Sequence, residues 1–345
     1  LASTPGYNPG VFVASGTGEE RARLLHAEQP NPMVSLAYRE NYPPGSVFKV
    51  MLAAAALEEG VINEKTEFFC PGYYQLNNKG RKWNCWKKEG HGHMNVVKAL
   101  AFSCDVFFYN VGLKLGPDRI HEWATRLGLG VQSGIDLPGE VEGLIPSQEW
   151  MVAKKSAQFP DRPWDHKWFP GDTLNVSIGQ GDVATTPLQN AILMAAIVNG
   201  GHRVRPYLNT SLSPEVSPPL LSPSTLEIVQ RGMRMCVEKE DFPSGTGRRA
   251  KVPGIVVLGK TGTAQAVGIQ HYEDYESEED IPYELRDHAL FIAGVLDQDP
   301  PLAISVVVEH GLHGSSAAAP LAGELIRYFY QQRRPQRLAQ TARTP

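Results

Sequence analysis

The sequence predicts a mixed fold in which an antiparallel sheet is flanked by helices. Ala- and Leu-rich segments with helical spacing occupy the first two thirds of the chain, and short β-rich runs separated by turns fill the last third. Consecutive strands joined by turns pair antiparallel. With 345 residues, 42% of them hydrophobic, the chain can bury a large core as one big domain or two intimate subdomains.

The helix signals are strongest at residues 46–59. This segment has no interior Gly or Pro, follows the rigid turn Pro43–Gly45, and ends at Gly60. The turn places Ser46 near the helix N-terminus, where free amides favour developing negative charge. We expect further helices at 95–115, 118–128, 187–199, 224–239 and 322–330.

The predicted strands are 254–258, 288–295 and 302–308. The Pro-rich stretches 160–170 and 213–223 are expected to be loops and not linkers between independent domains. There is no internal repeat.

The net charge of -4 includes an acidic run from Glu273 to Asp280 and a basic end from Arg333 onward. The basic residues are not interleaved with aromatic residues along a fold element, so we predict no nucleic-acid binding. The acidic run is expected to be a solvated loop. The sequence has no apolar stretch of about 18 residues and no signal peptide. Its abrupt start at Leu1 leads us to expect a fragment of a longer protein.

Three short motifs predict the chemistry: Ser46–Lys49, Ser103–Asp105 and Lys260–Thr263. A serine three residues before a lysine on a helix places hydroxyl and amine on one face, the arrangement that a serine acyl-transferase needs. Ser46 is also suited to be a helix cap. A cap, however, does not explain the other two motifs.

The third motif has a rival interpretation, because Gly254–Thr261 matches the P-loop pattern. A P-loop wraps a phosphate with its four variable residues and begins a helix at the lysine. Here those four residues are Ile, Val, Val and Leu, which favour a strand, and Gly262 follows the Lys-Thr pair. We therefore predict a strand that lines a cleft, with Gly262 letting a substrate approach the backbone.

These motifs, with several flanking segments, resemble the transpeptidase domain of class B penicillin-binding proteins. Asp105 in place of the usual Asn, and the segment 1–13, resemble the branch that serves cell elongation. The resemblance covers nearly the whole chain. The flanking segments that carry it are Tyr42–Ser46, Ser177–Gly181, Gly245–Gly247, Gly259–Gln265 and Val308–Gly311.

The resemblance implies the penicillin-binding protein and β-lactamase-like fold over residues 1–330, with a five-stranded antiparallel sheet and a mostly helical subdomain. Residues 331–345 are then a flexible basic tail. It also implies that a membrane anchor, a pedestal domain and the first sheet strand precede this chain. The catalytic domain is accordingly expected in the periplasm, tethered to the inner membrane.

The implied activity is that of a peptidoglycan D,D-transpeptidase, which cross-links stem peptides ending in D-Ala-D-Ala and is inhibited by β-lactams. Ser46 is the nucleophile, Lys49 its base, and Ser103 a proton relay. Lys260, Thr261 and Thr263 bind the donor carboxylate, and the amides of Ser46 and Thr263 form the oxyanion hole. No cofactor is needed. A SEDS-type glycosyltransferase and other elongation proteins are the expected partners in maintaining rod shape.

The role of Asp105 stays open at this stage. A carboxylate near Lys49 favours the charged amine and raises the pKa that a base mechanism wants lowered. Asp105 therefore either orients Lys49 as an ion pair or bonds the peptide of the substrate.

Three cysteines and a histidine crowd around the middle motif. Three thiolates and one imidazole make a closed tetrahedral zinc site, and elongation-type members of the resembled class have a metal site here that includes the cysteine of the middle motif. A disulfide and inert thiols remain alternatives, as does His93 in place of His91, while Cys236 is expected to be buried and silent. The predicted ligands of a structural zinc are Cys70, Cys85, His91 and Cys104.

Other functions on the same nucleophile are a D,D-carboxypeptidase and a β-lactamase, although no glutamate motif for deacylation can be assigned. A β-lactam sensor that acylates once without turnover is an alternative of a different class. Trp150, Trp164 and Trp168 are expected to pack a loop against the body.

Overall fold

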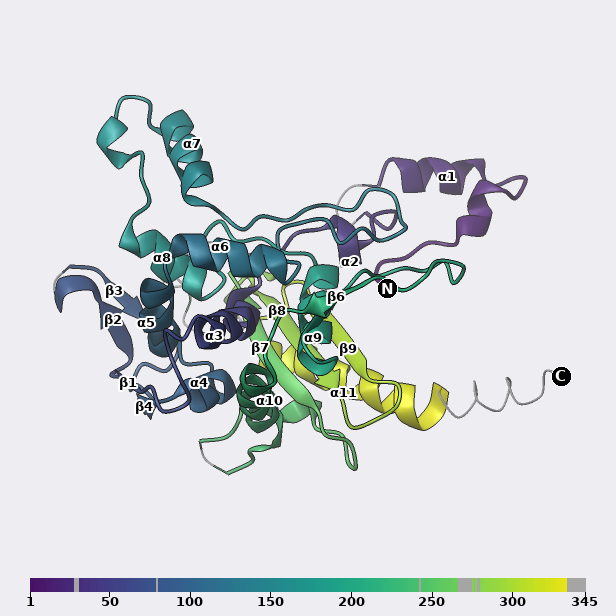
Figure 1. The fold of residues 1–345 in the computed structure, drawn as a ribbon. Helices are drawn as coiled ribbons and strands as arrows, with labels where there is room; N and C mark the ends of the chain where they lie inside the picture. The colour runs from purple at the N-terminus through teal and green to yellow at the C-terminus, as the bar shows by residue number, and fades with distance from the viewer. Residues whose placement is uncertain are drawn as a thin grey trace.

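A computed structural model shows an antiparallel sheet of three strands, β7 (Leu258–Ala264), β8 (His288–Val295) and β9 (Leu302–Val308), in the order β7-β8-β9. The sheet crosses the centre of the molecule, with a helical region on one side (Figure 1). The residues that the structure describes are 1–27, 31–78, 80–241, 243–265, 275, 277 and 280–333.

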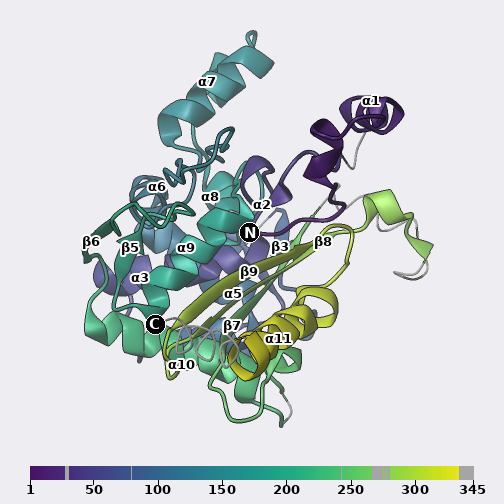
Figure 2. The ribbon, with the colours of Figure 1, turned by 90° about the vertical axis from the view of Figure 1, so that its right-hand side faces the viewer.

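The two faces of the sheet are covered by different helices. On β8 the odd-numbered residues Ala289, Phe291 and Ala293 pack toward α11 (Ala319–Tyr328), while Leu290 and Ile292 join the larger core. This alternation is the two-residue period of a strand. In Figure 2, α11 lies along one side of the sheet and α9 (Pro187–Val198) along the other.

The helical region is built around α3 (Phe48–Glu58), in which nine consecutive residues from Phe48 to Ala56 are buried. A single 3-10 turn, η2 (Gly45–Val47), precedes it, so the predicted helix at 46–59 is confirmed with a tighter first turn. The other helices are α1 (Gly18–Leu25), α2 (Leu36–Arg39), α4 (Val96–Phe102), α5 (Asp105–Leu115), α6 (Pro117–Arg126), α7 (Gln148–Gln158), α8 (Pro170–Ser177) and α10 (Pro223–Glu238).

The helix predicted at 95–115 is wrong in one respect, because it is two helices, α4 and α5. Ser103 has φ 56° and ψ 40°, in the left-handed region, and Cys104 is extended. A left-handed residue ends a helix. Because of this break, Ser103 and Asp105 do not lie on one continuous helix, and both residues line the cavity described below.

The strand predicted at 254–258 is also displaced, since β7 begins at Leu258 and carries the whole motif Lys260–Thr263. A Cβ added at Gly259 would lie 2.5 Å from the Phe291 ring, and one at Gly262 would lie 2.9 Å from the Pro44 carbonyl oxygen. Glycine is thus kept in this strand by close packing, against its usual propensity. The motif lies within a strand, so the P-loop alternative is excluded.

The five-stranded sheet is not found: in the part of the chain that the structure describes, the main sheet has three strands. No further described segment pairs with β7 or β9. Three small two-stranded sheets, which we did not predict, lie outside it. They are β1 (Phe68–Cys70) with β4 (Gly92–Met94), β2 (Tyr73–Gln75) with β3 (Lys82–Asn84), and β5 (His202–Val204) with β6 (Val216–Pro219).

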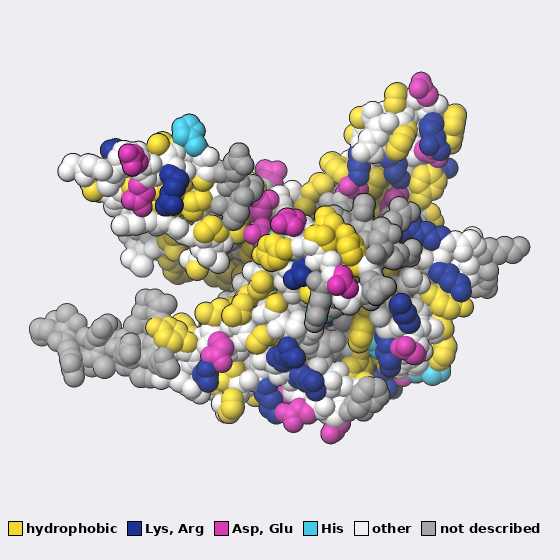
Figure 3. Space-filling view, turned by 180° about the vertical axis from the view of Figure 1, so that it is seen from behind, with side chains coloured by type: hydrophobic (Ala, Val, Ile, Leu, Met, Phe, Trp, Pro, Cys, Tyr) yellow, Lys and Arg dark blue, Asp and Glu magenta, His cyan; other side chains and the backbone are white. Residues whose placement is uncertain are grey.

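Two lobes, one around α1 and one around α7, project from the body and carry hydrophobic side chains on their surfaces (Figure 3). Trp164, near α7, is 64% exposed, so the prediction that it packs against the body is wrong. Neither lobe contributes a residue to the cavity described below. Within the described ranges, no helix is both long enough and apolar enough to cross a bilayer.

The predicted acidic loop at 273–280 falls largely outside the described residues, as does most of the basic tail at 331–345.

The turn that carries Ser46 is held against the sheet by Gly45. Gly45 has φ 52°, its amide donates to the Gly179 carbonyl oxygen at 2.9 Å, and an added Cβ would lie 2.3 Å from the Thr263 carbonyl oxygen. Only glycine combines this backbone conformation with this close approach.

We expect Gly45→Ala to lower the free energy of unfolding by about 1–3 kcal/mol, because the methyl group forces both a strained φ and a clash with β7. Urea unfolding measures the change. Gly18→Ala is the matched control, since an added Cβ there meets nothing within 4 Å. Equal stability of the two variants would contradict the packing described here.

Candidate active site

A cavity of about 840 Å³ lies where the sheet meets the helical region, and all three motifs contribute to its wall. Ser46 comes from the turn before α3, Ser103 and Asp105 from the α4–α5 break, and Thr261 to Thr263 from β7. The structure therefore brings together residues more than 200 positions apart in the sequence. The motif residues that line the cavity are Ser46, Ser103, Asp105, Thr261, Gly262 and Thr263.

The two motif lysines lie behind this wall. Lys49 and Lys260 are both 0% exposed, and neither is among the residues that line the cavity. Buried ammonium groups are rare unless they are compensated. Their partners therefore define the electrostatics of the site.

Lys49 makes three donor contacts, which match the three hydrogens of an ammonium group. Its Nζ lies 2.6 Å from Asp105 Oδ1, 3.0 Å from the Ser103 carbonyl oxygen and 3.2 Å from Ser103 Oγ. Burial raises the pKa of Asp105, and the Lys49 ammonium opposes that rise. Asp105 orients Lys49 as an ion pair, which is one of the two roles that the sequence left open.

Lys260 approaches the same serine from the other side. Its Nζ donates to Ser103 Oγ at 2.9 Å and to the Thr261 carbonyl oxygen at 3.0 Å. Burial lowers the pKa of Lys260 to about 7; the thiol of Cys236 opposes this, and the nearby Lys49 ammonium adds to the lowering. Ser103 Oγ thus bridges two amines. Among the residues that the structure describes, Lys49 has a carboxylate partner, Asp105, and Lys260 has none.

The strand β7 presents hydroxyl groups and backbone to the cavity. Thr261 Oγ1 donates to Thr246 Oγ1 at 2.9 Å, and Gln180 Nε2 donates to the Thr263 carbonyl oxygen at 3.1 Å. In the described sheet β7 is an edge strand, so alternate backbone groups have no neighbour strand on this side. Such an edge can bind an extended peptide.

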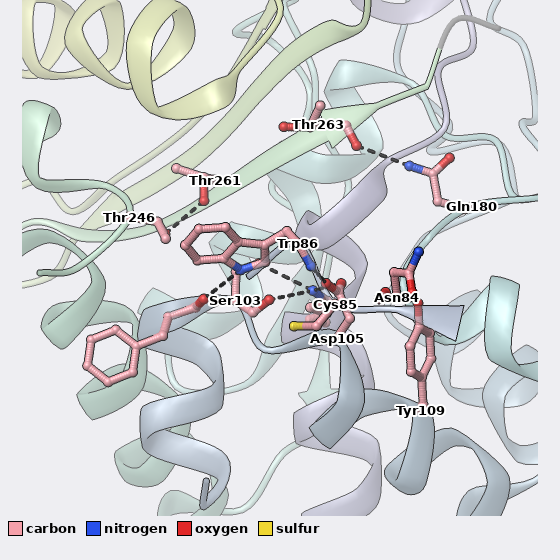
Figure 4. Close-up of polar contacts among 12 residues, drawn as sticks. Asn84, Cys85, Trp86, Ser103, Asp105, Tyr109, Gln180, Thr246, Thr261 and Thr263 are labelled. Carbon is pink, nitrogen blue, oxygen red and sulfur yellow. Dashed lines mark hydrogen bonds and ion pairs between the residues drawn. The ribbon is translucent and has the colours of Figure 1, made fainter. Parts of the chain in front are cut away.

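Sequence reasoning missed the contribution of Trp86. Its backbone N–H donates to Asp105 Oδ2 at 2.9 Å and its indole Nε1 donates to the Phe102 carbonyl oxygen at 3.0 Å. Figure 4 shows Trp86 beside Ser103 and Asp105, with Thr246 and Thr261 nearby. The one feature of the sequence that could have indicated this role is that Trp86 directly follows Cys85, a predicted metal ligand.

The predicted metal ligands also come together. The ligand atoms of Cys70, Cys85, His91 and Cys104 all lie within 4.8 Å of one another. His91 Nδ1 faces the Cys85 sulfur at 3.4 Å and the Cys70 sulfur at 3.7 Å. All four cysteines of the chain are free thiols, so the disulfide alternative is not found. The alternative ligand His93 is exposed and faces Glu67.

The thiols of the cluster compete for protons. Hydrogen bonds with Cys70 and Cys85, together with burial, raise the pKa of Cys104, whereas the hydrogen bond from Cys104 lowers the pKa of Cys70. Such crowding of buried sulfur atoms and an imidazole fits the donor set of zinc. Cys104 stands between Ser103 and Asp105, so the cluster adjoins the catalytic motif.

Cys236 is buried, as the sequence predicted, and it contacts a residue of the cavity wall. Its sulfur lies 3.3 Å from Thr246 Oγ1, which in turn accepts from Thr261. It is fully buried beneath the motif strand.

The fold and the buried serine–lysine arrangement define a serine acyl-transferase of the penicillin-recognising class. A family model for the penicillin-binding protein transpeptidase domain matches residues 1–327, and the chain belongs to this family. The resemblance inferred from the motifs is thereby confirmed.

Curated relatives are peptidoglycan D,D-transpeptidases named MrdA. The chain is 36% identical to the protein of Haemophilus influenzae, over 97% of this chain and 51% of that protein. It is 34% identical to that of Escherichia coli, over 95% of this chain and 51% of that protein. The chain therefore spans about half the length of the curated relatives it matches.

Solved structures of penicillin-binding protein 2 have the same fold. The protein of Pseudomonas aeruginosa, in complex with WCK 5153, has a TM-score of 0.79 and 32% identity, covering 96% of this chain and 68% of that chain. The protein of Helicobacter pylori in complex with MreC has a TM-score of 0.79 and 30% identity, covering 96% and 57%. The predicted fold class is thereby confirmed, apart from the number of strands.

We expect Asp105→Ala to lower the free energy of unfolding by about 3–5 kcal/mol, because it leaves the Lys49 ammonium buried without its carboxylate. Asp105→Asn, which keeps an oxygen for the Trp86 amide, should cost less. Urea unfolding near neutral pH measures both. The control is Glu240→Ala, which breaks the exposed pair with Lys251. If Asp105→Ala lowered the free energy of unfolding no more than this control does, the buried pair would not stabilise the fold as described.

Proposed function

We propose that this chain is the catalytic part of a peptidoglycan D,D-transpeptidase that works through an acyl-serine intermediate. The observation that carries the proposal is Ser46 on the cavity wall, one helical turn before the buried Lys49. Lys49 contacts Ser103 and Asp105 of the middle motif, and Ser103 Oγ in turn contacts Lys260 of the third motif. The relatives named peptidoglycan D,D-transpeptidase support the choice of substrate, a stem peptide that ends in D-Ala-D-Ala.

The reaction has two acyl transfers. Ser46 Oγ attacks the carbonyl between the two D-alanines, the peptide C–N bond breaks, and D-alanine leaves after taking up a proton at its nitrogen. An amine from a second stem then attacks the ester, forms the cross-link and returns the proton to Ser46 Oγ. A β-lactam enters as a donor whose amine stays attached, so the enzyme remains acylated.

The proton path follows the hydrogen bonds of Ser103. Lys49 is held as a charged donor by Asp105, so it must lose a proton before it can accept one from Ser46. Neutral Lys260 can take that proton through Ser103 Oγ, which contacts both amines. The reverse path delivers a proton to the leaving amine. Ser103 is thus the proton relay. Lys260, which lies behind the cavity wall, exchanges protons with Ser103 and does not bind the donor carboxylate.

The donor carboxylate is assigned to the hydroxyl groups of Thr261 and Thr263, which line the cavity on β7. The oxyanion is assigned to the backbone amides of Ser46 and Thr263, donors that are fixed before the reaction begins. Gly262 between the two threonines lets the peptide approach the strand.

We expect a penicillin to form a stable covalent adduct with the wild-type chain and none with Ser46→Ala, because the ester requires that hydroxyl. Intact-mass spectrometry measures the adduct. Ser315→Ala, which removes another hydroxyl from the cavity wall, is the matched control and should acylate. An adduct on Ser46→Ala would show that another residue is the nucleophile.

The rate of acylation should rise with pH through a midpoint at about 7, the pKa of Lys260. Only neutral Lys260 accepts a proton, so the rate should increase about tenfold between about pH 6 and 8. Lys260→Arg should lose this dependence, since a guanidinium stays protonated. Stopped-flow acylation by a chromogenic β-lactam measures the profile. A wild-type profile that is flat over this range would exclude the relay.

We also assign a structural zinc ion to Cys70, Cys85, His91 and Cys104, whose mutual distances fit a tetrahedral site. When bound, zinc would supply a cross-link that holds the segment from Cys70 to His91 against the α4–α5 break. Through Cys104 and Trp86, this segment keeps Ser103 and Asp105 in position. The ion takes no part in the acyl transfers.

Metal analysis of the purified chain should find one zinc ion, and Cys104→Ser should weaken its binding by more than about tenfold, because it removes a ligand. Cys236→Ser is the matched control, since Cys236 is also buried but lies outside the cluster. Loss of zinc should also slow acylation by penicillin. Equal zinc content in both variants would contradict the assignment.

The cellular role that we propose is cell-wall elongation and maintenance of rod shape, with the catalytic domain on the periplasmic side of the inner membrane. The support is the similarity to MrdA proteins and to penicillin-binding protein 2, which has been solved in complex with MreC. A solved peptidoglycan synthase complex that coordinates polymerization and crosslinking contains a chain 28% identical to this one, and it supports our proposal of a glycosyltransferase partner of the SEDS type.

A further inference from the structure

We propose that Gln180 is a positioning residue for acylation. Its side-chain amide, fixed at the end of α8, holds the Thr263 peptide group so that the Thr263 N–H faces the oxyanion beside the Ser46 N–H. The inference rests on the proposed function, from which it takes the two oxyanion amides, and it assigns a role to a residue outside the three motifs.

The end of α8 fixes the backbone position of Gln180. The Gly179 amide donates to the Val176 carbonyl oxygen at 2.9 Å, and the Gln180 amide donates to the Asn175 carbonyl oxygen at 3.1 Å. Gly179 has φ 67°, in the left-handed region. Two such bonds around a left-handed glycine form the Schellman motif, which ends a helix in one defined geometry. The side chain of Gln180 therefore starts from a backbone position that has little freedom.

The same segment holds the turn that carries Ser46. The Gly45 amide donates to the Gly179 carbonyl oxygen at 2.9 Å, and a Cβ added at Gly179 would lie 2.3 Å from the Gly45 carbonyl oxygen. Tyr42 and Thr185 exchange two backbone hydrogen bonds, each 2.9 Å long. Ser46 lies in the first turn of η2, where backbone N–H groups have no helical partner. The segment after α8 therefore fixes the turn that supplies one of the two oxyanion amides.

The side chain of Gln180 joins this segment to the other oxyanion amide. Its Nε2 donates to the Thr263 carbonyl oxygen at 3.1 Å, and Figure 4 shows the amide directed at that oxygen. In an antiparallel strand the N–H and C=O groups of one residue point to the same side, which is why paired residues can exchange both bonds. The Thr263 N–H therefore faces the side of β7 on which Gln180 lies. Ser46, Gln180 and Thr263 all line the cavity.

Thr263 needs this contact because β7 is an edge strand. On one side β8 pairs with it, with Thr263 opposite Ala289, and on the other side no strand of the described ranges pairs with it. An edge strand lacks the restraint that the hydrogen bonds of a second neighbour supply. An oxyanion donor must be in place before the reaction, and a misplacement of about 1 Å can lower a rate about 100-fold. Gln180 supplies the missing restraint from the segment that also holds Ser46.

Stopped-flow acylation by a chromogenic β-lactam, measured over a range of concentrations, tests this inference on the 345-residue chain. It separates the dissociation constant of the initial complex from the rate constant of acylation. Gln180→Met removes the donor without adding charge, and Gln180→Ala removes most of the side chain. The matched control is Gln75→Met, which removes an amide that donates to the Gly80 carbonyl oxygen at 2.7 Å, outside the cavity.

The affinity for a boronic acid is the second readout. Ser46 Oγ adds to boron and releases its proton, and the tetrahedral anion that forms places an oxygen where the oxyanion develops during acylation. This affinity reports on the two oxyanion amides without the departure of a leaving group.

We expect both Gln180 variants to acylate about tenfold or more slowly and to bind the boronic acid more weakly by a similar factor, because the Thr263 N–H is less well placed. The dissociation constant of the initial complex should stay within about twofold of the wild-type value, and the control should match the wild type in all three quantities.

A rate constant within about twofold of the wild type in either Gln180 variant would overturn the inference and leave the proposed function standing. Slower acylation with no loss of boronic acid affinity would also overturn it. So would a changed dissociation constant with an unchanged rate constant, since Gln180 would then act on the ligand itself. Failure of the wild type to acylate at all would overturn both the inference and the proposed function.

Discussion

The site depends on the hydroxyl group of Ser103, which joins two buried amines. Lys49 and Lys260 each lie within hydrogen-bonding distance of it, and within the described part of the chain Asp105 is the one carboxylate that pairs with either amine. Two ammonium groups this close and this deeply buried cannot both stay charged without a large cost. Burial, together with the neighbouring Lys49 ammonium, lowers the pKa of Lys260 to about 7, so Lys260 is the amine of the pair that titrates near neutral pH.

Much of the surrounding structure serves to hold this serine. The left-handed backbone at Ser103 ends α4 and turns its side chain between the two lysines. Gly45 lets the turn that bears Ser46 come into contact with β7, the strand that carries Lys260. Trp86 fixes both Asp105 and the end of α4. Strain and close approach of this kind are costly, and they are found here because the neighbouring contacts determine the geometry.

The chemistry could be predicted from the sequence to a greater extent than the local structure could. Motif spacing identified Ser46, Lys49, Ser103 and Lys260, and the structure brings them together.

The break between α4 and α5 was missed because Phe102, Ser103 and Cys104 carry no Gly or Pro signal, and a tertiary contact with two amines decides the conformation there. The start of β7 was misplaced because Gly259 and Gly262 are poor strand formers that close packing requires. The four proposed metal ligands are irregularly spaced in the sequence, so only the fold could show that their ligand atoms converge. Trp86 and Thr246 act through hydrogen bonds, which no periodic pattern reveals.

The central claim is that Lys260 is the neutral amine of the pair at physiological pH. Nuclear magnetic resonance of the chain with isotope-labelled lysine, titrated from about pH 5 to 11, observes the charge of each side chain directly. The account predicts one lysine with a midpoint near 7, absent from Lys260→Arg. A spectrum in which every lysine titrates near the ordinary value of about 10.4 would contradict it.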